Sequence, residues 1–552
     1  MQPPIAFLIT TVLVIGAVEA STGMLDYHSI SVNASIVTGT LKNHQGTNNA
    51  KVPTSNDESD SINDATAAVQ THWRNSSVKN VMIYTFPDVF TGDYTDGDAY
   101  DADNYNFTLA DERVQYVIDG GATASAQFQE AADFTLFSAE FLEGIGYMIT
   151  ERYVNGATNS GFTDAIELWD FYPEEDKLYD ATIDSDYAAS LIAYTAFSKG
   201  VARASNSTGC GAWGFKRLWT PSANYTLPDP WKESFFADLA ANRTPIKAAT
   251  FHWDATMFSW DPYEIVTATK QFRELYLTPN GFEDLPIWIT EHNRNPLGIL
   301  PTTESALAAY NDPASFASWV IAVAMYGQDA DAERVMSWTG LGYGGYGWGN
   351  AYFQAWYNQT DSGDIALNAG SAWVLSGDFV TNTPNRLAVV GSSDNGFTAL
   401  AGISSDEKEV QVLLNNYQVD YDIVKVESPK CGFAFILTLY TQVPTLETST
   451  STDPIYQENG LFNGEQACII FYDDLACTTF TQATIRDNTA TAYKLNIENL
   501  PWSSSTNYTA KIKRVGGDSI LETYKIVAGT GTSLSKTMPL PTAREKPSIR
   551  TK

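Results

Sequence analysis

The strongest constraint on the fold is an alternation that runs from about residue 40 to residue 340. Short apolar runs of strand length are followed by longer stretches whose apolar residues recur at helical spacing. Strands that alternate with helices form parallel sheets, because the helix carries the chain back to the start of the next strand. With a less regular run near 39–46 there are eight such runs, which predicts a (β/α)8 TIM barrel. The other runs are 80–86, 123–128, 165–169, 209–215, 246–253, 285–290 and 334–340, and helical stretches between them include 141–154, 187–204, 263–277 and 313–327.

The pattern changes after residue 370, where the apolar segments become short and rich in β-forming residues with turn residues between them. No helix is expected there, and the pattern predicts a C-terminal antiparallel β-sandwich. The alternating segment 28–37 is expected to join that sheet. The predicted division is 1–20 signal peptide, 21–40 N-terminal strand of the β-domain, 41–345 barrel, 346–542 β-sandwich accessory domain, and 543–552 polar tail.

The amino terminus and the glycosylation motifs point to export. The apolar stretch 5–18 is shorter than the about 20 residues that span a membrane. Val18-Glu19-Ala20 then offers small residues for cleavage, which is typical of a secretory signal peptide, with a signal anchor as the alternative. Sequons for N-glycosylation favour a secreted glycoprotein. They begin at Asn33, Asn75, Asn106, Asn206, Asn224, Asn242, Asn358 and Asn507.

Charge and cysteine content exclude several classes of partner. The chain has 65 acidic and 33 basic residues and a formal charge of −32, which argues against nucleic acid and anionic membranes. The 4 cysteines form no C-x-x-C pair, and the 5 histidines form no cluster, so neither a metal site nor a cofactor is expected. Three cysteines, Cys431, Cys468 and Cys477, lie in the last quarter, where a disulfide is plausible with its pairing open. The oligomeric state also stays open.

The ends of the predicted barrel strands carry the candidate functional residues, because that face forms the active site of a TIM barrel. Aromatic, carboxylate and imidazole side chains gather there without basic residues, which suits a neutral, polyhydroxylated ligand such as a sugar. Cleaving a glycosidic bond requires two carboxyl groups. Glu291 and Asp170, at the ends of the seventh and fourth strands, are the candidates. His252, His292, Trp169 and Trp338 are the predicted substrate-binding residues.

Several segments resemble glycoside hydrolase family 39, the β-xylosidase and α-L-iduronidase group of the retaining (β/α)8 clan. "PIWITEHN" (286–293) resembles the strand that carries the family's nucleophile, and "ATFHWDA" (249–255) resembles the strand before it. Segments 29–48, 105–128 and 493–515 add to the similarity, which covers most of the chain. The resemblance implies that Glu291 is the nucleophile. It also suggests that His252 binds substrate hydroxyls or orients Glu291, and that Trp338 forms the floor of the sugar subsite.

The fourth strand departs from the family pattern, which reads W-N-E-P with Glu as the general acid/base. This chain reads "LWDFYP" (168–173), so Asp170 replaces Asn and Phe171 replaces the catalytic Glu. Three explanations are open. Asp170 serves as the acid, or Glu174 or Glu175 folds back over the cleft, or hydrolysis has been lost and only binding remains.

These observations lead to one main hypothesis and two alternatives. The main hypothesis is a secreted glycosidase of retaining type that acts on a poly- or oligosaccharide, xyloside-like or related. The first alternative is a catalytically impaired carbohydrate-binding or surface glycoprotein on the same scaffold. The second is an extracellular structural glycoprotein that uses its β-domain for assembly. Fold alone does not separate the three.

Overall fold

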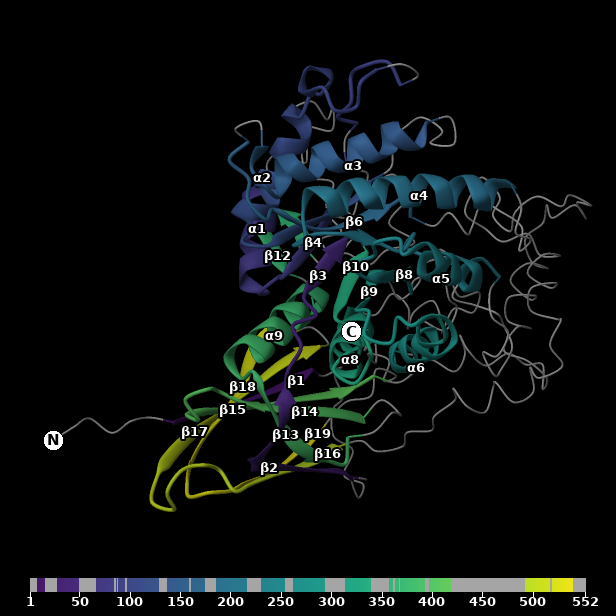
Figure 1. Ribbon diagram of the computed structural model, residues 1–552. Helices are drawn as coiled ribbons and strands as arrows, with labels where there is room; N and C mark the ends of the chain where they lie inside the picture. Colours follow the sequence, from purple (N-terminus) through teal and green to yellow (C-terminus); the bar gives the residue numbers. More distant parts are fainter. Residues whose placement is uncertain are drawn as a thin grey trace, which may run out of the picture.

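The structure, a computed structural model, consists of a parallel β/α barrel and a second, mainly antiparallel sheet (Figure 1). The residues it describes are 7–14, 27–48, 66–83, 86, 88–94, 97–128, 137–157, 160–173, 185–215, 230–253, 262–292, 313–338, 357–360, 363–366, 368–392, 397–417, 492–516 and 519–539. Among the described helices, none is long and apolar enough to cross a membrane.

The barrel is an 8-stranded parallel sheet in the order β7-β6-β5-β4-β3-β10-β9-β8. Isolated parallel bridges, Gly211 to Ala248 and Phe215 to Phe251, join its two ends and close the ring. This confirms the predicted TIM barrel. Its strands are β3 (Gly46–Asn48), β4 (Asn80–Ile83), β5 (Thr123–Phe128), β6 (Ile166–Phe171), β7 (Cys210–Gly211), β8 (Ala249–His252), β9 (Ile287–His292) and β10 (Arg334–Trp338).

Helices surround the barrel and contribute to its large apolar core. Ser138 caps α3 by accepting a hydrogen bond from the Phe141 amide, which satisfies one of the free N–H groups at the helix start. Helices α3 and α4 pack tightly against each other. Gly200 of α4 lies against the Glu143 carbonyl of α3, with no room for a side chain. The helices are α1 (Thr66–Asn75), α2 (Thr108–Asp119), α3 (Ala139–Tyr153), α4 (Ser185–Ala204), α5 (Pro230–Asn242), α6 (Glu264–Phe272), which continues as a π-helical turn (Arg273–Leu277), α8 (Pro313–Tyr326) and α9 (Asn368–Asn382).

Side chains alternate between the two faces of the barrel strands, as the pleat of a β-strand requires. A layer inside the barrel is built from Met82, Leu168, Ala248, Trp288 and Met336, all at most 2% exposed. Neighbouring residues of the same strands, such as Trp169 and Phe171, belong instead to the core shared with the helices. This alternation decides which residues at a strand end can reach the barrel axis.

The second sheet has 9 strands in the order β18-β17-β1-β15-β14-β13-β2-β16-β19. The sheet has its own buried apolar cluster, which includes residues of β2, β14, β16 and β17. Strand β2 pairs with β13 and β16, so the early alternating segment lies in this sheet. The strands are β1 (Phe7–Val14), β2 (Tyr27–Thr40), β13 (Asn385–Val390), β14 (Phe397–Ile403), β15 (Glu409–Asn416), β16 (Ala492–Glu498), β17 (Asn507–Gly516), β18 (Ser519–Thr530) and β19 (Leu534–Pro539), with a separate hairpin of β11 (Tyr357–Thr360) and β12 (Gly363–Ala366).

Strand β1 coincides with the apolar part of the predicted signal peptide. It lies between β15 and β17 and pairs in parallel with both. Removal of residues 1–20 during export would therefore leave these two strands without their common neighbour, and the exposed backbone groups would need new partners.

Helices α8 and α9 lie between the barrel and the second sheet (Figure 1). The α8 sequence is apolar on all sides, as expected for a helix buried on all sides. One face carries Trp319 in the barrel core, and another carries Ile321 in a cluster with Leu375 of α9 and Leu413 of β15. Helix α9 falls in the region where no helix was expected. Its apolar residues do recur at helical spacing, but the β-rich segments that follow obscured the pattern.

Candidate active site

Glu291 is the penultimate residue of β9. It lies at the centre of a buried hydrogen-bond network inside the barrel. The amides of Asn48 from β3 and Gln127 from β5 both donate to its Oε1, at 3.0 and 3.1 Å. The ring Nδ1 of His252, from β8, lies 3.3 Å from its Oε2. Glu291 is only 5% exposed, and both of its oxygens have side-chain contacts.

A register irregularity between β8 and β9 sets this geometry. Phe251 pairs with Ile289, whereas the next residue, His252, pairs with Glu291. Thr290 is passed over, and the amide of Trp253 then donates to the Glu291 carbonyl at 2.8 Å. A β-bulge of this kind redirects side chains next to active sites.

Asp170, near the end of β6, supplies a second carboxyl group and is fully buried. The hydroxyl of Thr250 donates to its Oδ1 at 2.9 Å. Desolvation by burial raises the pKa of this carboxyl to about 6, while the nearby His252 ring acts in the opposite direction. A carboxyl group with such a pKa keeps a proton under mildly acidic conditions and can donate it.

Two buried acceptor atoms of the site have no hydrogen-bond partner among the described residues. They are Oδ2 of Asp170 and the side-chain carbonyl Oε1 of Gln127, each on a residue at most 1% exposed. Unsatisfied buried polar atoms are costly, and they are common where a ligand or water completes the network. The Thr290 hydroxyl lies beside Asp170 and can supply one donor, whereas the Gln127 oxygen can accept from a hydroxyl group such as one of a sugar.

The structure separates the sequence-predicted residues into two groups. Asp170, His252 and Glu291 come together inside the barrel. Trp169 instead packs edge-on against Phe86 on the helix side of the barrel, and the ring of His292 lies 5.6 Å from Trp319 of α8.

These contacts of Trp169 and His292 are those of core residues, so the structure gives no support for the predicted sugar contacts. Their positions follow from the pleat, since each directly neighbours an inward-facing carboxylate. Burial lowers the pKa of His292 to about 3, which keeps its ring neutral. Trp338 ends β10 opposite Asn48 of β3.

Phe171, at the position of the family's acid, points away from the barrel axis. Its ring lies 4.7 Å from that of Phe197 and 6.2 Å from that of Tyr194, both on α4. It is fully buried there. The alternative acids Glu174 and Glu175 lie outside the described residues.

Asn48 and Thr250 are site residues that the sequence analysis did not single out. Asn48 falls at the end of β3, a strand of only 3 residues whose apolar pattern is weak. Thr250 lies two residues before His252 and therefore on the same face of β8. That period of two is the signal in the sequence that would have identified Thr250.

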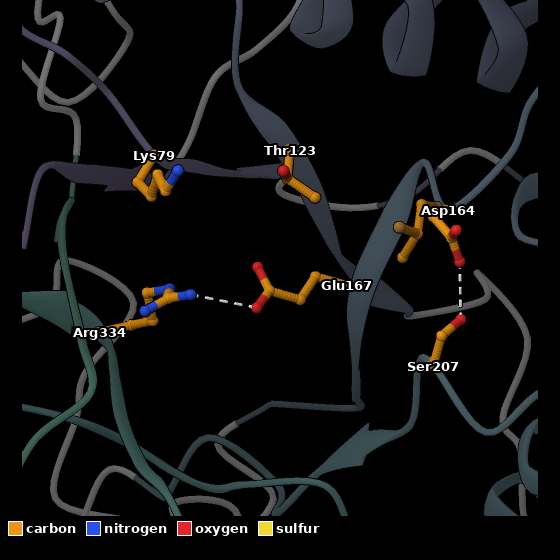
Figure 2. Close-up of a pocket in the computed structure, with 7 residues that line it drawn as sticks. Lys79, Thr123, Asp164, Glu167, Ser207 and Arg334 are labelled. Carbon is orange, nitrogen blue, oxygen red and sulfur yellow. Dashed lines mark hydrogen bonds and ion pairs between the residues drawn. The ribbon is translucent and has the colours of Figure 1, made fainter. Parts of the chain in front are cut away.

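A separate cavity of about 360 Å³ lies at the opposite end of the barrel, where the strands begin. Lys79, Thr123, Glu167 and Arg334 line it, and Asp164 bonds Ser207 at its side (Figure 2). Glu167 accepts from Arg334 at 3.2 Å and from Asn80 at 3.1 Å. Glu167 and Arg334 are thus paired by charge at the end of the barrel that serves stability in a TIM barrel.

The described residues contain no group of three or more His, Cys, Asp or Glu side chains that could hold a metal ion. Cys210 is a free, buried thiol. The three cysteines for which a disulfide was predicted lie outside the described residues.

The closed parallel barrel and its accessory sheet define the fold: a (β/α)8 barrel with a second, mainly antiparallel β-sheet. Comparison with solved structures agrees, since the neighbours include family 39 and related glycoside hydrolases. A glucosidase from Croceicoccus marinus superposes with a TM-score of 0.65 at 19% identity, over 94% of this chain and 98% of that one.

Two further structures bear out the resemblance to family 39 at the level of the fold. The GH39 enzyme from Xanthomonas axonopodis pv. citri matches with a TM-score of 0.52 at 10% identity, over 94% of this chain and 96% of that one. A monomeric beta-xylosidase from Caulobacter crescentus CB15 matches with a TM-score of 0.51 at 11% identity, over 93% and 97% of the two chains. No family model and no curated protein matches the sequence.

Proposed function

We propose that this protein is a glycoside hydrolase of retaining type that acts on a poly- or oligosaccharide, xyloside-like or related. The observation that carries the proposal is the pair of buried carboxyl groups on β6 and β9, held in different environments. Glu291 accepts contacts from three side chains, whereas Asp170 has a pKa raised to about 6 by burial. A buried carboxyl group whose pKa is raised can serve as the acid, which leaves the other carboxyl group as the nucleophile.

In the proposed reaction Glu291 attacks the anomeric carbon while Asp170 donates its proton to the leaving oxygen. The electron pair of the broken glycosidic bond passes to that oxygen, and a glycosyl ester forms on Glu291. Asp170, now ionised, takes a proton from water as the water oxygen bonds to the anomeric carbon and releases Glu291. Asn48 and Gln127 hold the attacking carboxylate in position, which restricts it to geometries close to attack.

The test is hydrolysis of aryl glycosides, including β-xylosides, together with trapping by mechanism-based fluoro-sugars. We expect Glu291 to carry the trapped sugar in peptide mass spectrometry, and Glu291→Gln to abolish trapping. Asp170→Asn should slow glycosides with poor leaving groups by about 10²- to 10⁴-fold and affect an activated aryl group far less. Failure of every fluoro-sugar to label Glu291 would refute the nucleophile assignment.

The second candidate function is carbohydrate binding without turnover. It is favoured by Phe171, which occupies the family's acid position and faces α4, and by the pairing of Glu291 with His252. In this case isothermal titration would detect oligosaccharide binding in the absence of hydrolysis, and Asp170→Asn would leave affinity within a few-fold of wild type.

We also propose that the protein is exported and N-glycosylated, as the signal-peptide pattern and the sequons suggest. The sequon asparagines Asn75, Asn106, Asn206, Asn242 and Asn507 are exposed, and Asn33 is half-exposed. Expression in eukaryotic cells should yield a medium fraction whose mass falls on treatment with a glycosidase that removes N-glycans. Sequencing the amino terminus of the secreted chain distinguishes a removed signal peptide from a retained β1 strand.

A further inference from the structure

His252 occupies a position between the two carboxyl groups rather than beside one of them. It ends β8 and is 1% exposed. Its backbone amide donates to the Phe215 carbonyl at 2.9 Å, which anchors the residue across the closure of the barrel. One edge of the ring faces Glu291, with Nδ1 at 3.3 Å from Oε2.

The other edge of the ring lies near Asp170, and the charge of the ring acts on that carboxyl, although no direct hydrogen bond joins Nε2 to it in the described part of the chain. A β-carbon built on Gly214 would lie 2.8 Å from Nε2 of His252 and 3.0 Å from Oδ2 of Asp170, so both atoms converge on one point. The backbone of Gly214 has a φ of +46°, which lets it approach them closely. Its amide donates to the Thr250 hydroxyl at 3.0 Å, and that hydroxyl bonds Asp170.

Two further ionisable groups, Cys210 of β7 and Tyr194 of α4, interact with Asp170, and burial raises the pKa of both. Both therefore stay uncharged near neutral pH. Among the described residues, Asp170 from β6 and Glu291 from β9 are the charged groups that face the His252 ring.

We propose that His252 is the shared counter-ion of the two carboxyl groups, an imidazolium whose Nδ1 edge serves Glu291 and whose Nε2 edge serves Asp170. The inference rests on the proposed function and deepens it. In the reactive form, which is populated below a pH of about 6, Glu291 is ionised and Asp170 holds the proton; in the free protein at higher pH Asp170 is ionised as well. In the glycosyl ester Glu291 is neutral and Asp170 is ionised.

One negative charge is present in both states, and it moves from one edge of the ring to the other. The imidazolium balances that charge in each half of the reaction without moving. His252 is thus a positioning residue, and the trio keeps the same net charge throughout. The arrangement depends on the carboxyl group of Asp170. Because the family pattern has Asn at this position, we expect the shared counter-ion only in chains with Asp there.

The test is a pH titration of histidine side chains labelled with ¹⁵N, which requires no substrate. The chain has only 5 histidines, so the His252 signals are assigned by their loss in His252→Gln. We expect His252 to remain an imidazolium above pH 7. In Glu291→Gln and in Asp170→Asn, its protonation midpoint should fall by about one to three pH units, because each carboxylate stabilises the charged ring.

His292 is the matched internal control, because its buried ring should stay neutral in all variants. A neutral His252 between pH 5 and 8 in the wild type would overturn the proposal. An unchanged midpoint in either single variant would also overturn it. The titration is made on the free protein, so it tests the role of His252 whether or not the protein is an active glycosidase. The fluoro-sugar experiment tests the proposed activity separately.

If the protein hydrolyses aryl glycosides, the kinetics give a second measurement. His252→Gln retains a donor toward Glu291 but carries no charge. Its kcat/KM should become less dependent on pH in the range where the wild-type ring titrates. A loss of activity with an unchanged pH profile would indicate a purely structural role and would contradict the shared counter-ion.

Discussion

Replacing Asp170 by Asn should stabilise the protein, and the gain should grow with pH. The pKa of Asp170 is raised from 3.8 to about 6 because the buried carboxyl is desolvated. Between these values the folded state binds more protons than the unfolded state, so the free energy of unfolding falls as pH rises. The shift of about 2 units corresponds to about 3 kcal/mol of destabilisation once the pH is well above 6.

Asparagine has almost the same shape, and its side-chain oxygen can still accept the hydrogen bond from Thr250. It does not ionise, so this cost disappears. We expect a gain in the free energy of unfolding of about 3 kcal/mol at pH 8, of which roughly half is already present at pH 5. Urea unfolding followed by tryptophan fluorescence at the two pH values measures the difference between variant and wild type.

Asp406→Asn is the matched control. Hydrogen bonds from Lys408 and Ser404 lower the pKa of Asp406 to about 2, so its stabilising contribution is present above pH 3.8 and lost as pH falls through 2. This variant should be less stable than wild type by the same amount at pH 5 and pH 8. The reasoning for Asp170 is refuted if its variant shows no larger gain at pH 8 than at pH 5.

Three further substitutions test the packing and ion pairing of the barrel domain. Gly200→Ala should lower the free energy of unfolding by about 1–3 kcal/mol in the same urea assay, because the added methyl overlaps a backbone carbonyl of α3. Gly39→Ala is the control and should be neutral, because the space around Gly39 is open. Arg334→Met should cost about 1.5–3 kcal/mol by removing the charged donor of Glu167, yet leave aryl-glycoside kinetics unchanged since this pair lies at the far end of the barrel. Phe171→Glu should unfold at lower urea without any gain in hydrolysis, and increased turnover would contradict its outward orientation.

The order of strands and helices was predictable because each local pattern agrees with the final fold. The run predicted at 123–128 is strand β5 at the same residues, and the helical stretch 141–154 corresponds to α3. The first barrel strand was predicted early, near 39–46, because residues up to Thr40 continue β2 and β3 begins only at Gly46. A strand of 3 residues contains too few positions for a period of two to be visible.

The candidate site was predictable only in part. Glu291 and Asp170 were found because polar residues at the end of an apolar strand are conspicuous. Their neighbours Trp169 and His292 were equally conspicuous, but the side-chain direction of each depends on the pleat and on a bulge between β8 and β9. A shift of one residue exchanges the two faces of a strand, so sequence position near a strand end does not show which residue faces the axis.

The sequence by itself determined the alternation that forms the barrel, the separate β-rich region, and the presence of carboxyl groups on the fourth and seventh strands. Only the tertiary structure decided that Asp170 and not Phe171 faces inward, and that His252 lies between Asp170 and Glu291. The physical reason is that periodicity is a local property of the chain, whereas a site is made by strands far apart in sequence whose registers are set by the closure of the whole barrel.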